Sequence, residues 1–556
     1  MKRLVTTAAL FSLLAAPAAP QGAASLKHTT SDGRLAPLLD NLGNLHVPVT
    51  TKNADAQKFF DQGMRLLYGF NHAEALRSFR EAARNDDGCA MAYWGQALAL
   101  APNINDSAIG PDREQQGYEA IREALKRKSN ASPKEQALIG ALAARFAEKP
   151  PEGGDRKELN AAYARAMEQV WSRFPDDPNV ATLYADAVMN TRPWDYWTKD
   201  GKPQPGIANA RAALERTIRE YPDHPGGHHI YIHLMEASDH IDLAVPSADR
   251  LGPMVPGAGH LVHMPSHVYI RVGRYLDAAA ANRKAIAADE DYITQCRAQG
   301  IYPAAYYPHN IHFLAAALVM AGRSAEAMQA ARKASARHGH EVPEELAGFA
   351  QLLEALPLLT MVRFGQWAAI EKEAGPAADQ PFVRSLYHVA RGMAFSATGR
   401  PGPAQAELAL AQQQAFRPVL KSMKIFDLNS LAEIAEIGVW MLRGDLAEKA
   451  GQSDEAVAAF RRAVDIDDSL LYSEPPDWFI PPRQYLAHAY LSAGNAAEAE
   501  RVYREDLKRH RNNGWALRGL EESLRKQGKT AEADRVRADF ERAWRQADVR
   551  LSGSRF

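Results

Sequence analysis

The sequence is poor in the features that mark several classes of protein. Its 556 residues include only two cysteines, Cys89 and Cys296, which excludes a scaffold held together by many disulfides. The 66 Lys and Arg residues nearly balance the 67 Asp and Glu residues, so the composition indicates no nucleic acid partner. Beyond the N-terminus we find no apolar run of the roughly 20 residues that span a bilayer. We therefore expect no membrane span.

The N-terminus has the layout of a secretory signal. A basic start is followed by an apolar run at residues 4–16 and by small residues at 17–24. The apolar run is too short for a membrane span and suits a signal peptide that is cut off on export. The sequence thus predicts a signal peptide at 1–24, a short extension at 25–50, and a periplasmic or secreted protein.

A repeated helix–turn–helix pattern accounts for most of the chain, which has no Gly/Ser or Pro linker between domains. Glycine recurs at the turn and small residues follow it, for example at Gly273, Gly322, Gly451 and Gly494. The spacing approaches the roughly 34 residues of a tetratricopeptide repeat. We predict an all-α, right-handed superhelical solenoid of about nine to ten such helix pairs. Its parts are N-terminal repeats at 51–225 with an insertion at 190–206, histidine-rich repeats at 226–345, and C-terminal repeats at 346–556.

Histidine is concentrated in the middle of the chain. Twelve of the eighteen histidines lie between 224 and 340, in the strings GGHHIYIHLMEAS, GHLVHMPSHVYIR and YYPHNIHF. Spacings of three, four and seven residues place side chains on one stripe of a helix, and aligning the repeats puts these stripes on the concave face. Histidine is the commonest metal ligand. The predicted metal ligands are His229, His233, Glu236, His260, His263, His267, His309 and His312.

Pro265 interrupts the central histidine string. A proline inside a helix removes a hydrogen bond and clashes with the preceding turn. Either the helix kinks there, or it begins near Pro265 and leaves His260 and His263 in the entering loop. Both arrangements allow these side chains to converge with His267.

The ligand types narrow the choice of metal. Nitrogen ligands with one carboxylate and no thiolate favour copper, with zinc or iron as alternatives, and they exclude an iron–sulfur cluster. Eight ligands exceed the four to six that one ion takes, so either two ions bind or some residues orient the others. In a zinc hydrolase Glu236 would be the catalytic base, although the HExxH motif is absent. Arg271 would hold an anionic substrate group or pair with an acidic neighbour.

Two irregular segments are rich in aromatic residues and proline. The insertion at 190–206 carries Trp194, Tyr196 and Trp197, and a second segment lies at 473–484. Long loops of this kind often cover a binding site. The insertion is either a lid over a small-molecule site or a loop packed on the outside, and the second segment could reach the groove from the C-terminal side.

Four strings stand out along the chain: FFDQGMRLLYGFNHAEALRSFREAA, CAMAYWGQALALAPNIN, PGAGHLVHMPSHVYIRVGRY and YYPHNIHFLAAA. Through these strings the chain resembles a poorly characterised group of exported bacterial tetratricopeptide-repeat proteins. The resemblance implies the repeat fold and an envelope location, but no established activity. Two hypotheses follow: an exported metal-binding protein, with a copper-dependent oxidoreductase favoured over a zinc hydrolase, or a scaffold whose groove binds a protein or peptide partner. Histidines at the groove positions favour metal.

Overall fold

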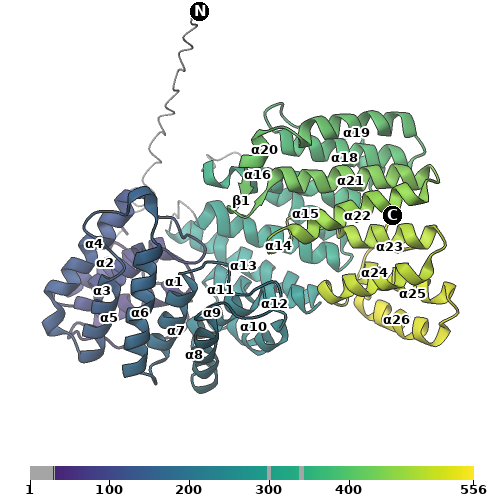
Figure 1. The fold of residues 1–556 in the computed structure, drawn as a ribbon. Coiled ribbons are helices and arrows are strands. Elements are labelled where there is room, and N and C mark those ends of the chain that lie inside the picture. Colours follow the sequence, from purple (N-terminus) through teal and green to yellow (C-terminus); the bar gives the residue numbers. More distant parts are fainter. Residues whose placement is uncertain (1–28, 31, 297–301, 337–343) are drawn as a thin grey trace, which may run out of the picture.

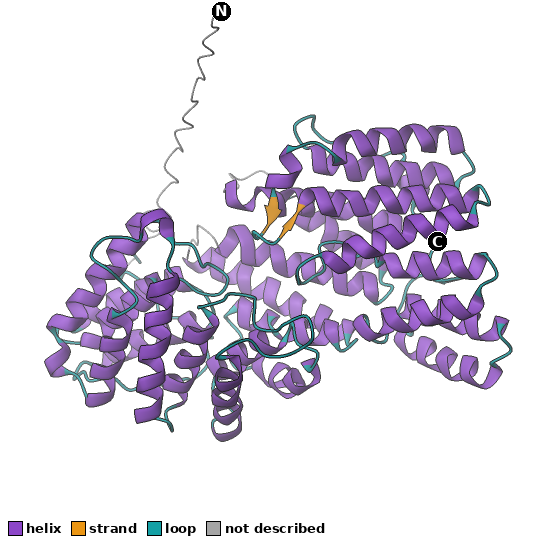
Figure 2. Ribbon diagram, in the orientation of Figure 1, coloured by secondary structure: helices purple, strands orange, loops and turns teal. Residues whose placement is uncertain are grey.

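The computed structural model describes the chain except for residues 1–28, 31, 297–301 and 337–343. The predicted signal peptide thus lies outside the described residues. What is described is almost entirely helical, as predicted, with one two-stranded hairpin, β1 (Lys424–Ile425) and β2 (Asn429–Ser430). Figure 2 shows this hairpin as the pair of strands among the helices.

The helices follow one another in antiparallel pairs. The N-terminal part contains α1 (Ala54–Tyr68), α2 (His72–Asn85), α3 (Ala90–Leu100), α4 (Pro111–Lys126), α5 (Pro133–Ala143), α6 (Lys157–Arg173), α7 (Pro178–Met189) and α8 (Ile207–Glu220). The middle contains α9 (Pro225–Met235), α10 (Val245–Leu251), α11 (Gly259–His263), α12 (Pro265–Arg271), α13 (Tyr275–Cys296), α14 (Tyr307–Met320) and α15 (Ser324–Ser335). A π-helical turn, Tyr302–Tyr306, leads into α14.

The C-terminal part completes the stack. It contains α16 (Ala347–Arg363), α17 (Trp367–Ile370), α18 (Pro381–Ala397), α19 (Pro401–Ala415), α20 (Val419–Ser422), α21 (Leu431–Lys449), α22 (Ser453–Ser469), α23 (Pro482–Ser492), α24 (Ala496–Arg509), α25 (Gly514–Lys526) and α26 (Thr530–Ala543). In Figure 1 the N-terminal helices lie at one end, the C-terminal helices at the other, and α9 to α14 between them.

Glycine makes the tight turns between paired helices possible. Gly273 and Gly322 have φ angles of 78° and 71°, a left-handed conformation that costs glycine little. At each turn the next residue donates its N–H to a carbonyl five residues earlier, as Arg274 does to Tyr269. Each of these turn glycines therefore allows the same hydrogen bond, which ends the first helix of its pair.

The C-terminal helices fold back onto the middle of the chain. The Trp515 indole donates to the carbonyl of Val319 over 3.2 Å, and Tyr275 Oη donates to the carbonyl of Arg511 over 2.8 Å. These contacts join α25 and the α24–α25 turn to α14 and α13. As a result, the segment before α23 is brought over the histidine-rich helices.

One helical stretch passes the length and composition test for a membrane span, although the sequence analysis expected none. The stretch Glu344–Arg363, which includes α16, is long and apolar enough to cross a bilayer by length and composition. However, 72% of that window is buried inside the protein, as is typical of a core helix. Cys89 and Cys296 are both buried and free, so they form no disulfide with each other.

The pairing of α1, α2 and α3 rests on close approach at two glycines. A Cβ on Gly95 or Gly63 would lie 2.5 Å from the ring of Phe79, which is fully buried. We expect Gly95→Ala to lower the stability by about 1 to 3 kcal/mol, because overpacking outweighs the better helix propensity of alanine. Thermal unfolding followed by circular dichroism measures the change.

Gly140→Ala in α5 is the matched control. Its added Cβ would meet nothing closer than 3.5 Å. This variant should be as stable as the parent or slightly more stable, by about 0.5 to 1 kcal/mol. If both variants melted alike, the packing of Phe79 against Gly95 would not be as described.

Candidate metal centre

Four helices carry the histidines of the site. His229 and His233 lie on α9, His260 on α11, His267 on α12 and His309 on α14. The chain kinks at Met264, which keeps a helical φ of −49° and ψ of −36° between α11 and α12. The kink is the first of the two arrangements expected around the proline. The histidines before it therefore lie on a short helix and not in a loop.

Three histidines form a first group, which we call the first trio: His229, His233 and His260. One ring nitrogen of each lies within 4.8 Å of the other two. The Nε2 atoms of His229 and His260 are 3.0 Å apart. His233 Nε2 is buried without a hydrogen-bond partner. Because a buried polar atom is costly to leave unpaired, this nitrogen is available to a ligand.

A second trio consists of His263, His267 and His309. One ring nitrogen of each again lies within 4.8 Å of the other two, and the Nε2 atoms of His263 and His267 are 2.9 Å apart. Asn282 fixes the orientation of His263, since its Oδ1 lies 2.7 Å from His263 Nδ1 while its Nδ2 donates to the carbonyl of Ala278. The Nδ1 of His263 must then donate, so its Nε2 carries the lone pair that faces His267 Nε2.

Glu236, at the C-terminal end of α9, connects the two trios. Its Oε1 lies 2.7 Å from Nδ1 of His233 and its Oε2 lies 2.6 Å from Nδ1 of His267. Glu474 adds a second carboxylate 3.0 Å from the same Nδ1 of His267. Glu236, His267 and Glu474 also offer ligand atoms within 4.8 Å of one another. Thus the carboxylates hold the Nδ1 side of one histidine in each trio, and Nε2 faces its trio.

Burial and charge set the protonation of the site. Burial lowers the pKa of His229, His260 and His263 well below the usual value of imidazole, so these rings are neutral and able to bind a metal. Burial also acts to lower the pKa of His267. The adjacent carboxylates of Glu236 and Glu474 outweigh that effect and raise it.

Two other predicted site residues lie outside the trios. His312 is buried, but it joins neither trio, and its ring lies 6.2 Å from that of Phe349. Arg271 donates to the backbone carbonyls of Glu236 and Ser238, the latter over 3.3 Å. It therefore supports the end of α9 and, among the described residues, forms no ion pair with an acidic side chain.

The groove expected from the repeat alignment is filled. The histidines of the first trio are at most 2% exposed, and only His309 of the second trio is half-buried. Part of the cover is the insertion at 190–206. Trp194 contacts His233 with ring centroids 5.5 Å apart, and the Trp197 indole donates to the carbonyl of Leu234 over 2.7 Å. The insertion thus lies over the site, as expected of a lid, and not on the outside of the solenoid.

Sequence reasoning missed several side chains of the centre. They are Phe70, Asn282, Tyr306, Phe313 and Glu474. Only the segment that holds Glu474 was expected to reach the groove. The others lie at ordinary repeat positions, where no spacing signal separates them from packing residues.

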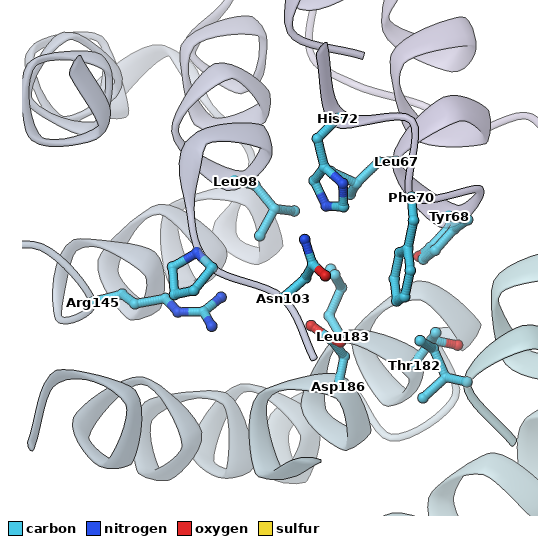
Figure 3. A pocket seen from close by; sticks show the side chains of 12 residues that line it. Leu67, Tyr68, Phe70, His72, Leu98, Asn103, Arg145, Thr182, Leu183 and Asp186 are labelled. Carbon is cyan, nitrogen blue, oxygen red and sulfur yellow. The ribbon is translucent and has the colours of Figure 1, made fainter. Parts of the chain in front are cut away.

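A small cavity of about 30 Å³ adjoins the first trio. Its lining includes Phe70, His72, Arg145 and Asp186, and Figure 3 shows the polar side chains converging on it. Arg145 is 1% exposed, and its Nη2 is buried without a hydrogen-bond partner. The volume suits a few water molecules. Phe70 belongs both to the cavity wall and to the contacts of the trio.

Comparison with known proteins identifies one repeat unit by sequence. Residues 437–469 match the model of the tetratricopeptide repeat. No curated protein sequence matches the chain. Among solved structures it is similar to the human IFIT1 dimer with m7Gppp-AAAA, at 14% identity and a TM-score of 0.30 over 89% of this chain and 91% of that chain. The dimer with PPP-AAAA gives 14% identity and a TM-score of 0.29 over 90% and 92%. Residues 437–469 are thus a tetratricopeptide repeat within a chain whose described part is built of paired helices.

Asp289 is linked to the first trio through Tyr302, and its ionisation should make the stability of the protein depend on pH. It accepts hydrogen bonds from Tyr302 over 2.8 Å and from Asn310 over 2.7 Å, and Tyr302 Oη in turn accepts the N–H of His260. Burial raises the pKa of Asp289 from 3.8 to about 7. Between these values the folded protein holds a proton that the unfolded chain has released. This group's contribution to stability is therefore complete below about pH 4 and falls as the pH rises through about 7.

The variant Asp289→Asn removes this titration. We expect the parent to lose stability relative to the variant between about pH 5 and about pH 8, as measured by urea unfolding at both values. A stability difference that stayed constant with pH would show that Asp289 is ionised in the folded protein.

Proposed function

We propose that the protein is an exported metalloprotein that binds two transition-metal ions, one at each histidine trio, and that it acts as an oxidoreductase with copper. The observation that carries this proposal is the shared carboxylate of Glu236, which holds one imidazole of each trio by its Nδ1 side. A carboxylate on the far nitrogen of a histidine is the usual way to fix and strengthen a metal ligand.

The chemistry of the ligands supports copper. Each trio offers three imidazole nitrogens, which suit copper and zinc, and divalent copper binds such sites most tightly. The two sites are close, since the ring centroids of His233 and His267 are 6.2 Å apart. Ions held by neighbouring trios could act on one small reactant, and bound copper would supply one-electron chemistry.

A zinc hydrolase is less well supported. Its base would be Glu236, but each oxygen of that carboxylate already lies within 2.7 Å of a histidine Nδ1. A base that activates water needs a free oxygen within hydrogen-bond reach of that water. A peptide ligand at this site is also disfavoured, because the trios are buried and not exposed along a groove. A protein partner would use another surface of the scaffold.

Metal stoichiometry tests the proposal directly. We expect elemental analysis of the copper-reconstituted parent to give about two ions per chain. The double variants His229→Ala/His260→Ala and His263→Ala/His309→Ala should each retain about one, because each removes one trio. His240→Ala, at an exposed position, is the matched control and should retain both ions.

The metal contents and the oxygen consumption of these proteins test the metal site and the oxidoreductase activity separately. Under a tenth of an ion per chain in the parent would overturn the metal proposal. Two ions in both double variants would place the metal elsewhere. Oxygen consumption with ascorbate by the copper-loaded parent, lost in both double variants, supports the oxidoreductase, whereas a two-ion protein without this activity would overturn that part.

Glu236→Gln tests the role of the shared carboxylate. Glutamine has one acceptor oxygen in place of two, and it removes the negative charge between His233 and His267. We expect metal affinity to fall at both trios by roughly 10- to 100-fold, in a competition titration with a coloured chelator. Glu474→Gln, which changes a contact to His267 alone, should weaken only the second trio. Loss at one trio only in Glu236→Gln would contradict the bridging role.

A further inference from the structure

Residues other than glycine that have positive φ are rare in the described part of the chain. They are Phe70, Trp194, Phe426, Asp427 and Asn512, with φ angles between 49° and 65°. Residues 426–428 join β1 to β2, and Phe426 and Asp427 are the central pair of the turn in which Leu428 donates its N–H to the carbonyl of Ile425, where positive φ at both positions is usual. Asn512 is of a type that tolerates this conformation. Phe70 and Trp194 have no such local explanation.

Phe70 stands where other helix pairs have glycine. Asn71 donates its N–H to the carbonyl of Leu66, five residues earlier, over 2.9 Å. The same bond closes the turns that contain Gly273 and Gly322, and in both of them the glycine precedes the donor. The Phe70 turn therefore has the ordinary repeat geometry but carries a residue that is strained in it.

The strained residue is in direct contact with the first trio. The Phe70 ring stacks on His233 at 5.6 Å with an interplanar angle of 10°, and on His260 at 5.3 Å with an angle of 16°. It meets His229 edge-on at 4.5 Å. One phenyl ring thus touches every imidazole of the trio, and a glycine in its place would touch none.

Trp194, in the insertion at 190–206, also contacts the first trio. Its ring meets His233 edge-on at 5.5 Å, while its indole N–H donates to the carbonyl of Ile104 over 3.0 Å. That hydrogen bond anchors the ring, since the carbonyl belongs to the segment after α3. Both unexplained strained residues are therefore aromatic, and both press on the same imidazole.

The far side of Phe70 faces the small cavity. Figure 3 shows its ring beside the space that His72, Arg145 and Asp186 also line. The ring thus contacts the first trio and also lines the cavity. A smaller side chain at this position would leave space between the two.

We infer that Phe70 and Trp194 are positioning residues of the first metal site: they fix its imidazoles in place, and Phe70 separates the bound ion from the solvent-sized cavity. This inference rests on the proposed function for its metal, and on the ring contacts described above for the positioning. Strained residues are common at functional sites, because the surrounding fold holds them in the conformation that the site needs.

Metal-free protein gives the first test. Aromatic stacking shifts the ring-proton signals of the stacked histidines in NMR spectra, so Phe70→Leu should move those of His233 and His260, while Phe70→Tyr should retain them. Phe426→Leu is the matched control: this phenylalanine also has positive φ, but it contacts Phe349 and no histidine of the trios. Unchanged histidine signals in Phe70→Leu would overturn the stacking, whatever the metal experiments give.

Cobalt provides the second test, in a His263→Ala/His309→Ala background that leaves the first trio alone. With Co²⁺ as probe, we expect Phe70→Leu to bind about tenfold more weakly. We also expect its visible spectrum to respond to added azide through the opened cavity, while the background protein and its Phe426→Leu and Phe70→Tyr variants do not respond. Equal affinity and equal insensitivity to azide in Phe70→Leu would overturn the inference. No Co²⁺ in the background protein would instead overturn the proposed metal site.

Discussion

The centre depends on one buried carboxylate. Glu236 is fully buried, and an unpaired charge in such a place would be prohibitively costly. Its two oxygens are each met by a histidine Nδ1, one from α9 itself and one from α12. This requirement fixes the distance and rotation of two helices that belong to successive repeats. Arg271 strengthens the arrangement, because its guanidinium binds the carbonyls at the end of α9 that no helical N–H can reach.

The remaining contacts of the centre come from parts of the chain that fold over the histidine-rich helices. An open stack of repeats would leave these imidazoles in water, where burial could not keep them neutral. Here Phe70 comes from the first helix pair, Trp194 from the insertion and Glu474 from the segment before α23. The return of the C-terminal helices onto α13 and α14 makes the last of these contacts possible. The site is therefore a product of the whole chain and not of the histidine repeats alone.

The fold could be predicted from the sequence because the same helix–turn–helix pattern recurs many times along the chain. The helical stripes also brought six of the seven proposed histidines into the two trios. His312 differs because on α14 its ring lies near Phe349, with the ring centroids 6.2 Å apart, whereas His260 and His263, which have the same spacing of three, both face a trio. Glu474 lies 207 residues from its partner His267, so nothing in local spacing could join them. Phe70 was hidden because strain depends on φ, which a sequence pattern does not state.

The two trios are unequal, and this bears on the proposed chemistry. The second trio has two carboxylates against His267, so its surroundings attract a cation strongly. The first trio has Phe70 and Trp194 against its rings, with Glu236 behind His233 as its nearest acid. An apolar surrounding favours the less charged state of a metal, and a carboxylate surrounding favours the more charged one. On the proposed function, the first trio would favour the less charged state of a bound copper ion and the second trio the more charged state. The two trios would therefore supply different chemistry, which two identical sites would not.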